Sequence, residues 1–455
     1  MDGNSISGNE FISKHVQGLA AHLDIDKSLY DIHDVKRGLR NHDGTGVMAG
    51  VTRVGSTQGY YVRDGEKTAM DGKLYYRGID VADIVDGFLK DGRPGFEETA
   101  YLLIFGVLPD KNTLDEFCGL LEEYRNLPDG FTEDMILAAP SVNIMNKLAR
   151  GVLALYSYDD EPEYDAANLE KEVRRALHLL ARCPVIVANA YAAKRHYFDL
   201  ESLYLHRPRT GLSVAENLLF SVRHDNSYTD EEARLLDLCM VLHAEHGGGN
   251  NSAFSCRVLS SSGTDIYSAI SAAVGSLKGP RHGGANEKVM NMFSIIERDV
   301  KDWTDEDEVT AYLTKIIRGE APTEDKLIYG MGHAVYTLSD PRAIMLKNLA
   351  RTLAEKAGVA EEFQLFETVE KLAPAVYRRE KKLDKPLCAN VDMYSGLVYK
   401  MLGIPQELYT PIFAIARMAG WCAHRLEEIY SGGKIIRPAY KAVGLDEAYK
   451  PLSAR

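Results

Sequence analysis

The sequence predicts a mainly α-helical fold with a small β-hairpin region near the N-terminus. Apolar residues recur at helical spacing through most of the chain, and few runs alternate with period two. The best strand candidates lie within "GYYVRDGEKTAMDGKLYYRGID", residues 59–80, where Gly65 and Gly72 could turn a hairpin. With 455 residues the chain is too long for one ordinary core, so we expect two domains or one large domain with an insert.

Four segments carry the helical pattern most clearly. "FEETAYLLIFGVLP" (96–109) predicts a helix that stops at Gly106, and "CPVIVANAYAAKRHY" predicts one that starts with Pro184 in its first turn. "TDIYSAISAAVGSLKG" (264–279) has an apolar stripe and small residues on its other faces, so we expect it deep in the core. "TPIFAIARMAGWCAHRLEEI" (410–429) predicts another long helix.

Composition and charge exclude several classes of protein. Hydrophobic residues are 45% and charged residues 26% of the chain, as in ordinary globular proteins. The net charge of −13 argues against a general nucleic-acid binder, which needs basic phosphate contacts. The six scattered cysteines form no CxxC pair and predict free thiols, and no segment has a signal-peptide or membrane-spanning pattern. A cytoplasmic location is therefore expected.

Histidines and glycines come together in two stretches of the second half. "HAEHGGGNNSAF" places His243 and His246 three apart, which predicts a shared helix face before three glycines end the helix. The alternatives are core or capping histidines, or a metal site, for which a third ligand is needed. "GPRHGGANE" holds His282 in a tight glycine-rich turn ahead of a helix that begins near Asn286. Gly283 and the glycine after it would let a ligand approach the backbone closely.

At three further places a charged residue lies at or within a predicted apolar helix, which is unusual. In "YGMGHAVYTLSDPRA", His333 follows two glycines, and Arg342 stands at a predicted helix start, where a charge entering an apolar helix needs a partner. In "NVDMYSGLVYKMLGIP", Asp392 precedes an apolar helix, with a simple N-capping aspartate as the alternative. In "FAIARMAGW", Arg417 lies one turn from both Phe413 and Trp421, and a buried guanidinium there would need an anionic partner.

The order and spacing of these motifs resemble the citrate synthase family over most of the chain. "HAEHGGGN", "GPRHGGANE", "GMGHAVYTLSDPRA", "NVDMYSG" and "ARMAGW" followed by "RP" carry the resemblance, and "LYYRGIDVADI" and "FEETAYLLIFGVLP" extend it more loosely into the N-terminal half. Each motif is weak alone, but their ordered combination is specific. The resemblance implies condensation of acetyl-CoA with oxaloacetate and hydrolysis of the citryl thioester, the entry step of the tricarboxylic acid cycle.

The resemblance also implies a role for each site residue. Asp392 would remove a proton from the acetyl methyl group, His282 would stabilise the enolate oxygen, and His333 would polarise the ketone of oxaloacetate. The residues expected to bind oxaloacetate are His246, Arg342, Arg417 and Arg437. The counterpart of Arg437 comes from the partner subunit, so a homodimer with shared sites is expected. Neither a metal nor a cofactor is expected, and acetyl-CoA is a substrate.

The family architecture implies a division of the chain into two domains. Residues 1–286 and 398–455 would form a large helical domain with the dimer contacts and the oxaloacetate site. Residues 287–397 would form a small domain that carries the CoA site and closes over the active site. The alternatives are a 2-methylcitrate synthase that uses propionyl-CoA, a citryl-CoA lyase of the same fold, a non-catalytic relative, and a metal-dependent hydrolase through the histidines.

A basic run before Asp392 is a candidate for binding the CoA phosphates. "RREKKLDK" (378–385) carries five cations against two acids in a chain of net charge −13. It would take the place of the basic residue that eukaryotic members of the family carry near Thr337, where this chain has none. The alternative is a solvated helix face, which is what most charge runs are.

Overall fold

The computed structural model describes residues 16, 23–41, 43–63, 66–163, 168–323, 325–383, 386–431, 433–444 and 448–454. The chain divides into two compact units. One unit joins residues 1–50 to residues 437–455 and holds the short helix α2 (Ser28–Ile32). The other unit, residues 51–436, holds the sheet and helices α3 to α17. The predicted division at residues 287 and 397 is a different partition and stays a prediction.

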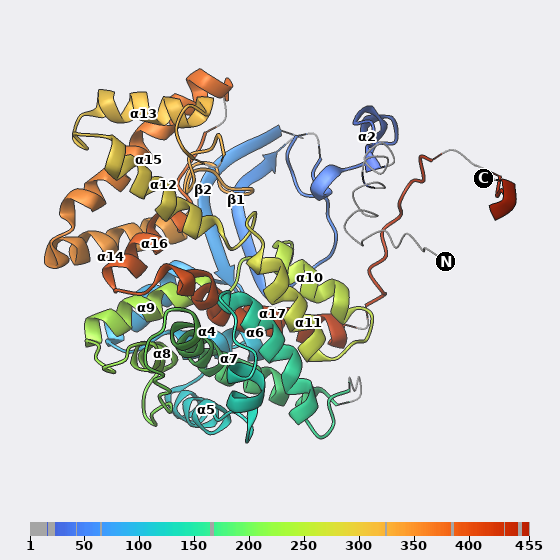
Figure 1. The fold of residues 1–455 in the computed structure, drawn as a ribbon, viewed down its shortest axis with the longest axis vertical. Helices are drawn as coiled ribbons and strands as arrows, with labels where there is room; N and C mark the ends of the chain where they lie inside the picture. Colours follow the sequence, from blue (N-terminus) through green and yellow to red (C-terminus); the bar gives the residue numbers. More distant parts are fainter. Residues whose placement is uncertain are drawn as a thin grey trace, which may run out of the picture. The chain divides into compact units, whose positions relative to one another are not determined.

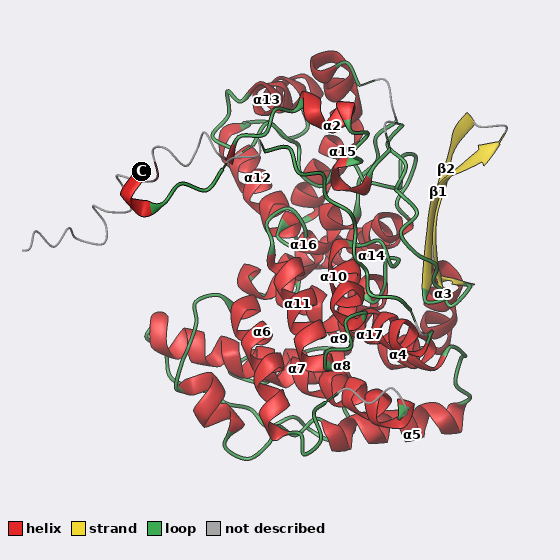
Figure 2. Cartoon of the chain, turned by 90° about the vertical axis from the view of Figure 1, so that its right-hand side faces the viewer, coloured by secondary structure: helices red, strands yellow, loops and turns green. Residues whose placement is uncertain are grey.

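Helices build the larger unit, as the sequence predicts, and Figure 2 shows how little of the described chain is strand. Its α-helices are α3 (Val81–Asp91), α4 (Phe96–Phe105), α5 (Lys111–Tyr124), α6 (Ile144–Ala154), α7 (Leu169–Phe198), α8 (Val214–Val222), α9 (Asp230–His243), α10 (Asn251–Ser260), α11 (Ile266–Lys278), α12 (Ala285–Asp299), α13 (Glu306–Arg318), α14 (Pro341–Ala357), α15 (Ala360–Lys381), α16 (Val391–Met401) and α17 (Tyr409–Tyr430). In Figure 1, α12 to α16 gather beside one another, whereas α4 to α8 lie at the opposite end of this unit.

The predicted hairpin is present near the start of the larger unit. Strands β1 (Gly55–Arg63) and β2 (Glu66–Tyr76) pair antiparallel, and the short β3 (Ile79–Asp80) pairs with β2 to give the order β1-β2-β3. Gly65, expected in the turn, lies outside the described residues. Gly72 lies inside β2 and not in a turn. A Cβ at this position would collide with the Ser339 carbonyl oxygen, so the glycine lets the hairpin pack against the loop before α14.

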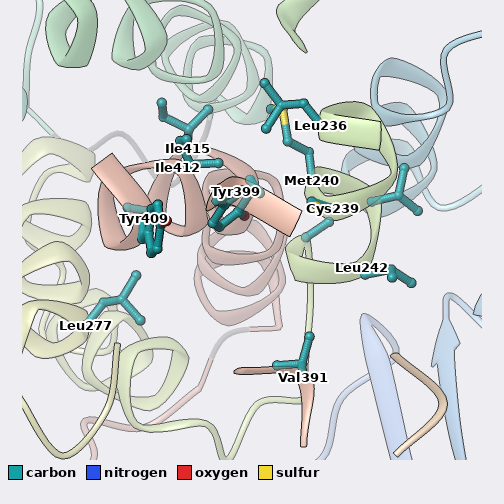
Figure 3. Close-up of a cluster of buried hydrophobic side chains, with 14 of the residues drawn as sticks. Leu236, Cys239, Met240, Leu242, Leu277, Val391, Tyr399, Tyr409, Ile412 and Ile415 are labelled. Carbon is teal, nitrogen blue, oxygen red and sulfur yellow. The ribbon is translucent and has the colours of Figure 1, made fainter. Parts of the chain in front are cut away.

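The core of the larger unit is made where α9, α11, α16 and α17 meet. Figure 3 shows side chains of these helices packed together, including Leu236, Leu277, Tyr399 and Ile412. All of them are buried. The prediction for α11 is confirmed only in part: its apolar stripe is fully inaccessible to solvent, but Ser271 and Ala272 on its other faces are half-buried and Gly275 is exposed. Close packing of this kind fixes α16 and α17, which carry two of the predicted site residues.

Two helix predictions have opposite outcomes. Helix α4 ends at Phe105, and Gly106 follows in the left-handed conformation with φ of 84°, as the sequence predicts. The prediction that a helix starts at Pro184 is wrong, because α7 starts at Leu169 with Asn168 as its N-cap and runs on through the proline. Packing against α5, α6, α8 and α17 holds the helix together across this position.

Helix α7 is also long and apolar enough to cross a membrane by length and composition. However, 83% of its most apolar window is buried within the protein. Its hydropathy therefore reflects burial against neighbouring helices.

Candidate active site

The end of α9 and the turn that follows it carry two of the histidines singled out in the sequence, His243 and His246. Helix α9 ends at His243, so the prediction that His243 and His246 share a helix face is wrong. Both side chains are buried, and burial together with nearby Arg342 and Arg417 holds the pKa of each well below its ordinary value. Both ring nitrogens of His243 and Nε2 of His246 have no hydrogen-bond partner among the described residues. His243 packs on Phe413, with ring centres 4.3 Å apart, whereas His246 faces other members of the site.

The glycine-rich turn between α11 and α12 holds His282 partly buried. Its Nε2 lies 3.0 Å from Ser252 Oγ and 3.1 Å from Asn250 Oδ1. Trp421 Nε1 donates to the same serine oxygen at 3.1 Å, and the serine hydroxyl donates to Asn250 Oδ1 at 2.8 Å. Burial, with a smaller contribution from Arg417, lowers the pKa of His282 to about 4. The ring is therefore neutral at physiological pH. Its Nε2 contacts the protein, whereas Nδ1 makes no hydrogen bond to the described residues.

The loop before α14 holds His333 against His246. Their ring centres are 5.0 Å apart, and the His333 ring stacks on Tyr336 at 4.6 Å. Nδ1 of His333 accepts the backbone N–H groups of Val335 and Tyr336, at 3.0 and 3.1 Å. In a neutral imidazole the hydrogen then sits on Nε2, so the backbone sets the tautomer of this histidine. The ring is held as a donor through Nε2.

Arg342 lies in the first turn of α14 with the ionic partner that its position requires. Asp340 caps the helix and accepts from Arg342 Nε at 3.1 Å and from Nη2 at 2.8 Å. Both side chains are buried, and the aspartate raises the pKa of Arg342 against the effect of burial. The guanidinium is thus fixed in one orientation as a cation.

Arg417, in the middle of α17, is buried, and only some of its hydrogen-bond donors have a partner among the described residues. Its Nε donates to the His243 carbonyl oxygen at 2.6 Å, and its guanidinium lies 4.7 Å from the centre of the Phe413 ring. Nη1 and Nη2 have no hydrogen-bond partner among the described residues. Burial lowers the pKa of Arg417 to about 10, which leaves it cationic at neutral pH. A buried fork with two open donors is matched to a carboxylate.

Asp392 lies in the first turn of α16, but it is not the N-cap. Asn390 is the cap, and its side chain accepts the backbone N–H of Asp392 at 3.0 Å. The N-capping alternative for Asp392 is therefore excluded. Burial raises the pKa of the carboxyl to about 6, although Arg342 and Arg417 oppose this. A carboxylate whose pKa lies close to neutral pH is suited to act as a general base.

The structure brings six of the seven predicted site residues together. Electrostatic interactions link His246 to His282, His333 and both arginines, and link Asp392 to the same two arginines. Arg437 is exposed and belongs to the unit formed by the two ends of the chain, so its predicted role stays a prediction. In the basic run, Lys385 lies outside the described residues, Lys381 and Lys382 are exposed, and Arg379 donates to Thr314 Oγ1 at 2.5 Å.

Sequence reasoning missed the residues that bond to the site residues and fix their positions. Glu245 and His424 are fully buried and joined by a 2.8 Å contact across 179 residues of chain. Asn250 and Ser252 contact His282, and the hairpin supports the His333 loop through Gly72 N, which donates to Ser339 Oγ at 3.0 Å. Glu245 sits inside the "HAEH" motif, and a charged residue between two site histidines was the available signal.

Comparison with known proteins agrees with this arrangement. The family model "Citrate synthase, C-terminal domain" matches residues 45–439. The citrate synthase of Synechocystis sp. is 34% identical over 396 residues, which are 85% of this chain and 89% of that protein. The citrate synthase of Haloferax volcanii is 34% identical over 404 residues, covering 88% and 98% of the two chains. The crystal structure of citrate synthase from Thermotoga maritima superimposes with a TM-score of 0.73 at 30% identity, covering 92% and 99%.

Fold and relatives together define a helical enzyme of the acyltransferase class. Within that class, the chain belongs to the citrate synthase family.

Proposed function

We propose that this protein condenses acetyl-CoA with oxaloacetate and hydrolyses the resulting citryl thioester to citrate and CoA. The observation that carries the proposal is Arg417, a buried cation with two open donors beside neutral histidines and a basic carboxylate. Such a site is built for a small dicarboxylic acid, because the ligand supplies the hydrogen-bond acceptors that the protein lacks. The relatives named citrate synthase support the same substrates.

Oxaloacetate binding would use the two arginines and two of the histidines. Arg417 would take one carboxylate with its open Nη1 and Nη2, and Arg342 would contribute its fixed positive charge. Nε2 of His246 is buried with no partner among the residues that the structure describes, and it would bind a further oxygen of the ligand. His333 would donate from Nε2 to the ketone oxygen, polarising the carbon that the enolate attacks.

Proton transfer would be divided between Asp392 and His282. Asp392 removes a proton from the acetyl methyl group, and a pKa of about 6 keeps most of this base ionised at pH 7. His282 then donates from Nδ1 to the enolate oxygen, which requires Nε2 to be the acceptor in the neutral ring. The Ser252 hydroxyl, 3.0 Å away and itself an acceptor from Trp421, donates to Asn250 Oδ1 at 2.8 Å, so it would have to turn from that oxygen to donate the matching hydrogen bond.

Assembly and domain motion belong to the same proposal. We expect a homodimer in which Arg437 of each chain completes the site of the other, in a cytoplasmic enzyme without a metal or cofactor. We also expect residues 287–397 to close over the bound substrates, because exclusion of water protects the thioester until condensation is complete.

A thiol-release assay tests the proposal. The purified protein is given oxaloacetate with either acetyl-CoA or propionyl-CoA, and free CoA is measured together with the acid that is formed. Faster release with acetyl-CoA and formation of citrate are expected. Preference for propionyl-CoA would identify a 2-methylcitrate synthase, and no release with either thioester would contradict condensation altogether.

A further inference from the structure

One face of α17 bonds to the turn after α9 and to α10, which follows that turn. Arg417, Trp421, His424 and Glu428 follow at helical spacing, so they share that face. Arg417 donates to the His243 carbonyl, Trp421 to Ser252, and Glu428 accepts from Arg257 at 2.8 Å. The backbone N–H of Gly420 also donates to the Ala244 carbonyl at 3.2 Å. The turn that carries His246 is therefore attached along this helix.

Glu245 is the one residue of that turn whose charge points back into the protein. Its side chain is fully buried, and one oxygen, Oε1, contacts His424 Nε2 at 2.8 Å and accepts the backbone N–H of Gly247. Two glycines make room for it. A Cβ at Gly55 would lie 2.7 Å from Glu245 Cγ, and a Cβ at Gly420 would collide with Oε2.

The state of His424 follows from its other neighbour. Its Nδ1 lies 3.2 Å from Arg257 Nε and 2.8 Å from Arg257 Nη2. A guanidinium has no acceptor, so Nδ1 accepts, Nε2 carries the hydrogen, and the ring is a neutral donor to the glutamate. Arg257 is itself bound to Glu427 and Glu428. His424 therefore holds Glu245 through a hydrogen bond, and Arg257 is committed to two other carboxylates.

Arg417 is the cation that remains for this charge. Glu245 Oε2, which lies against Gly420 of α17, and both Nη atoms of Arg417, one turn earlier in the same helix, are buried without hydrogen-bond partners among the described residues. Burial opposes ionisation of both groups, but His424 and then Arg417 lower the pKa of Glu245, and Glu245 in turn works against the lowering of the Arg417 pKa by burial. Asp392 also interacts with Arg417, but more weakly than Glu245 does, and Arg342 is already paired with Asp340.

We propose that Glu245, held by His424, is the resident counter-ion of Arg417, so that it offsets the Arg417 charge in the empty site and limits how tightly the site holds its dianionic ligand. Glu245 is thus a positioning residue that acts through Arg417. The part that concerns the ligand rests on the proposed function, whereas the pairing of the two buried charges does not.

The sign of the effect on ligand binding follows from the charges. Glu245→Gln keeps an oxygen that can accept from His424 and removes only the negative charge. The empty site then holds an unbalanced cation, so the free protein loses stability, but the oxaloacetate dianion is attracted more strongly. We expect its dissociation constant to fall on the order of tenfold, from one buried charge at an effective dielectric constant of about 20. A residue with only a structural role would not tighten binding.

The matched control is Glu172→Gln. Glu172 is equally buried and is paired at 3.0 Å with Arg425, which lies in α17 as Arg417 does. Glu172 contacts none of the predicted site residues in the described part of the chain. Its loss should lower the unfolding temperature and leave the oxaloacetate dissociation constant within about twofold of the wild-type value.

The deciding experiment is a double-mutant cycle on the full chain, with urea unfolding as the readout. Glu245→Gln and Arg417→Gln should each destabilise the protein, and the double variant should be more stable than the sum of the two losses predicts. Glu172→Gln combined with Arg417→Gln should be additive. If Glu245→Gln alone fails to fold, a soluble double variant supports the pairing, and an insoluble one overturns it.

The outcomes separate this inference from the proposed function. Additive losses for Glu245 and Arg417, or an unchanged or weaker oxaloacetate affinity in Glu245→Gln, would overturn the counter-ion role even in an active enzyme. Coupled losses in a protein that releases no thiol would leave the charge pairing intact and refute the proposed reaction alone.

Discussion

Replacing Asp392 by asparagine tests the central step of the proposed reaction. The amide has nearly the same shape as the carboxyl group but cannot accept the methyl proton. The change leaves the start of α16 intact, because Asn390 is the N-cap and bonds to the backbone N–H of residue 392 at 3.0 Å. We therefore expect a folded protein that binds oxaloacetate with nearly normal affinity.

The size of the loss follows from the role of the group. Removal of one positioned base lowers kcat by roughly a hundred- to ten-thousand-fold, which is about 3 to 5 kcal/mol of transition-state stabilisation. The pH profile gives a second measure. Burial raises the pKa of Asp392 to about 6, so about nine-tenths of the enzyme carries the ionised base at pH 7 and about one-tenth at pH 5. Activity should therefore rise with pH through this range, by about tenfold.

The assay measures thiol release at saturating acetyl-CoA from pH 5 to pH 8, and calorimetry measures oxaloacetate binding in parallel. The wild-type protein should show the acid limb near pH 6, and Asp392→Asn should lack both the activity and the limb. Citrate formation within about tenfold of the wild-type rate, with the acid limb retained, would remove Asp392 from the mechanism.

Three other predictions concern the dimer, the thioester and the hairpin. An Arg437→Ala chain mixed with an inactive Asp392→Asn chain should regain activity, because one site of each heterodimer would carry no lesion; mixed dimers without activity would refute the cross-subunit role. Neutralising Lys381, Lys382 and Lys385 of the basic run together should raise the acetyl-CoA KM and flatten its salt dependence, with little change in the oxaloacetate KM. Unchanged acetyl-CoA kinetics would show that the run is only a solvated surface. Gly72→Ala should destabilise the protein by about 1 to 3 kcal/mol in urea unfolding and raise the oxaloacetate KM, because its Cβ meets the Ser339 carbonyl beside the His333 loop. Gly87→Ala, in α3 with open space around it, is the matched control and should do neither.

Local pattern was sufficient for much of the helical framework. The segments that became α4, α11 and α17 repeat apolar residues at helical spacing, and glycine or a capping side chain marks the ends of α4 and α11. Local pattern failed at Pro184, where the rule for helix starts was outweighed by the packing of α7 on its neighbours. It failed again after His243, because three-residue spacing shows a shared face only where the helix continues.

The sequence by itself determined which chemical groups the site contains. Motif order pointed to the histidines, the arginines and Asp392 through the resemblance to the citrate synthase family, which implied the role of each residue. Only the tertiary structure decided the state of those groups. The neutral histidines, the tautomer of His333 and the open donors of Arg417 depend on burial and on hydrogen bonds between distant segments. Glu245 and His424, 179 residues apart, meet only because α17 crosses the turn after α9. Desolvation and long-range contacts are properties of the packed chain, and no local spacing in the sequence encodes them.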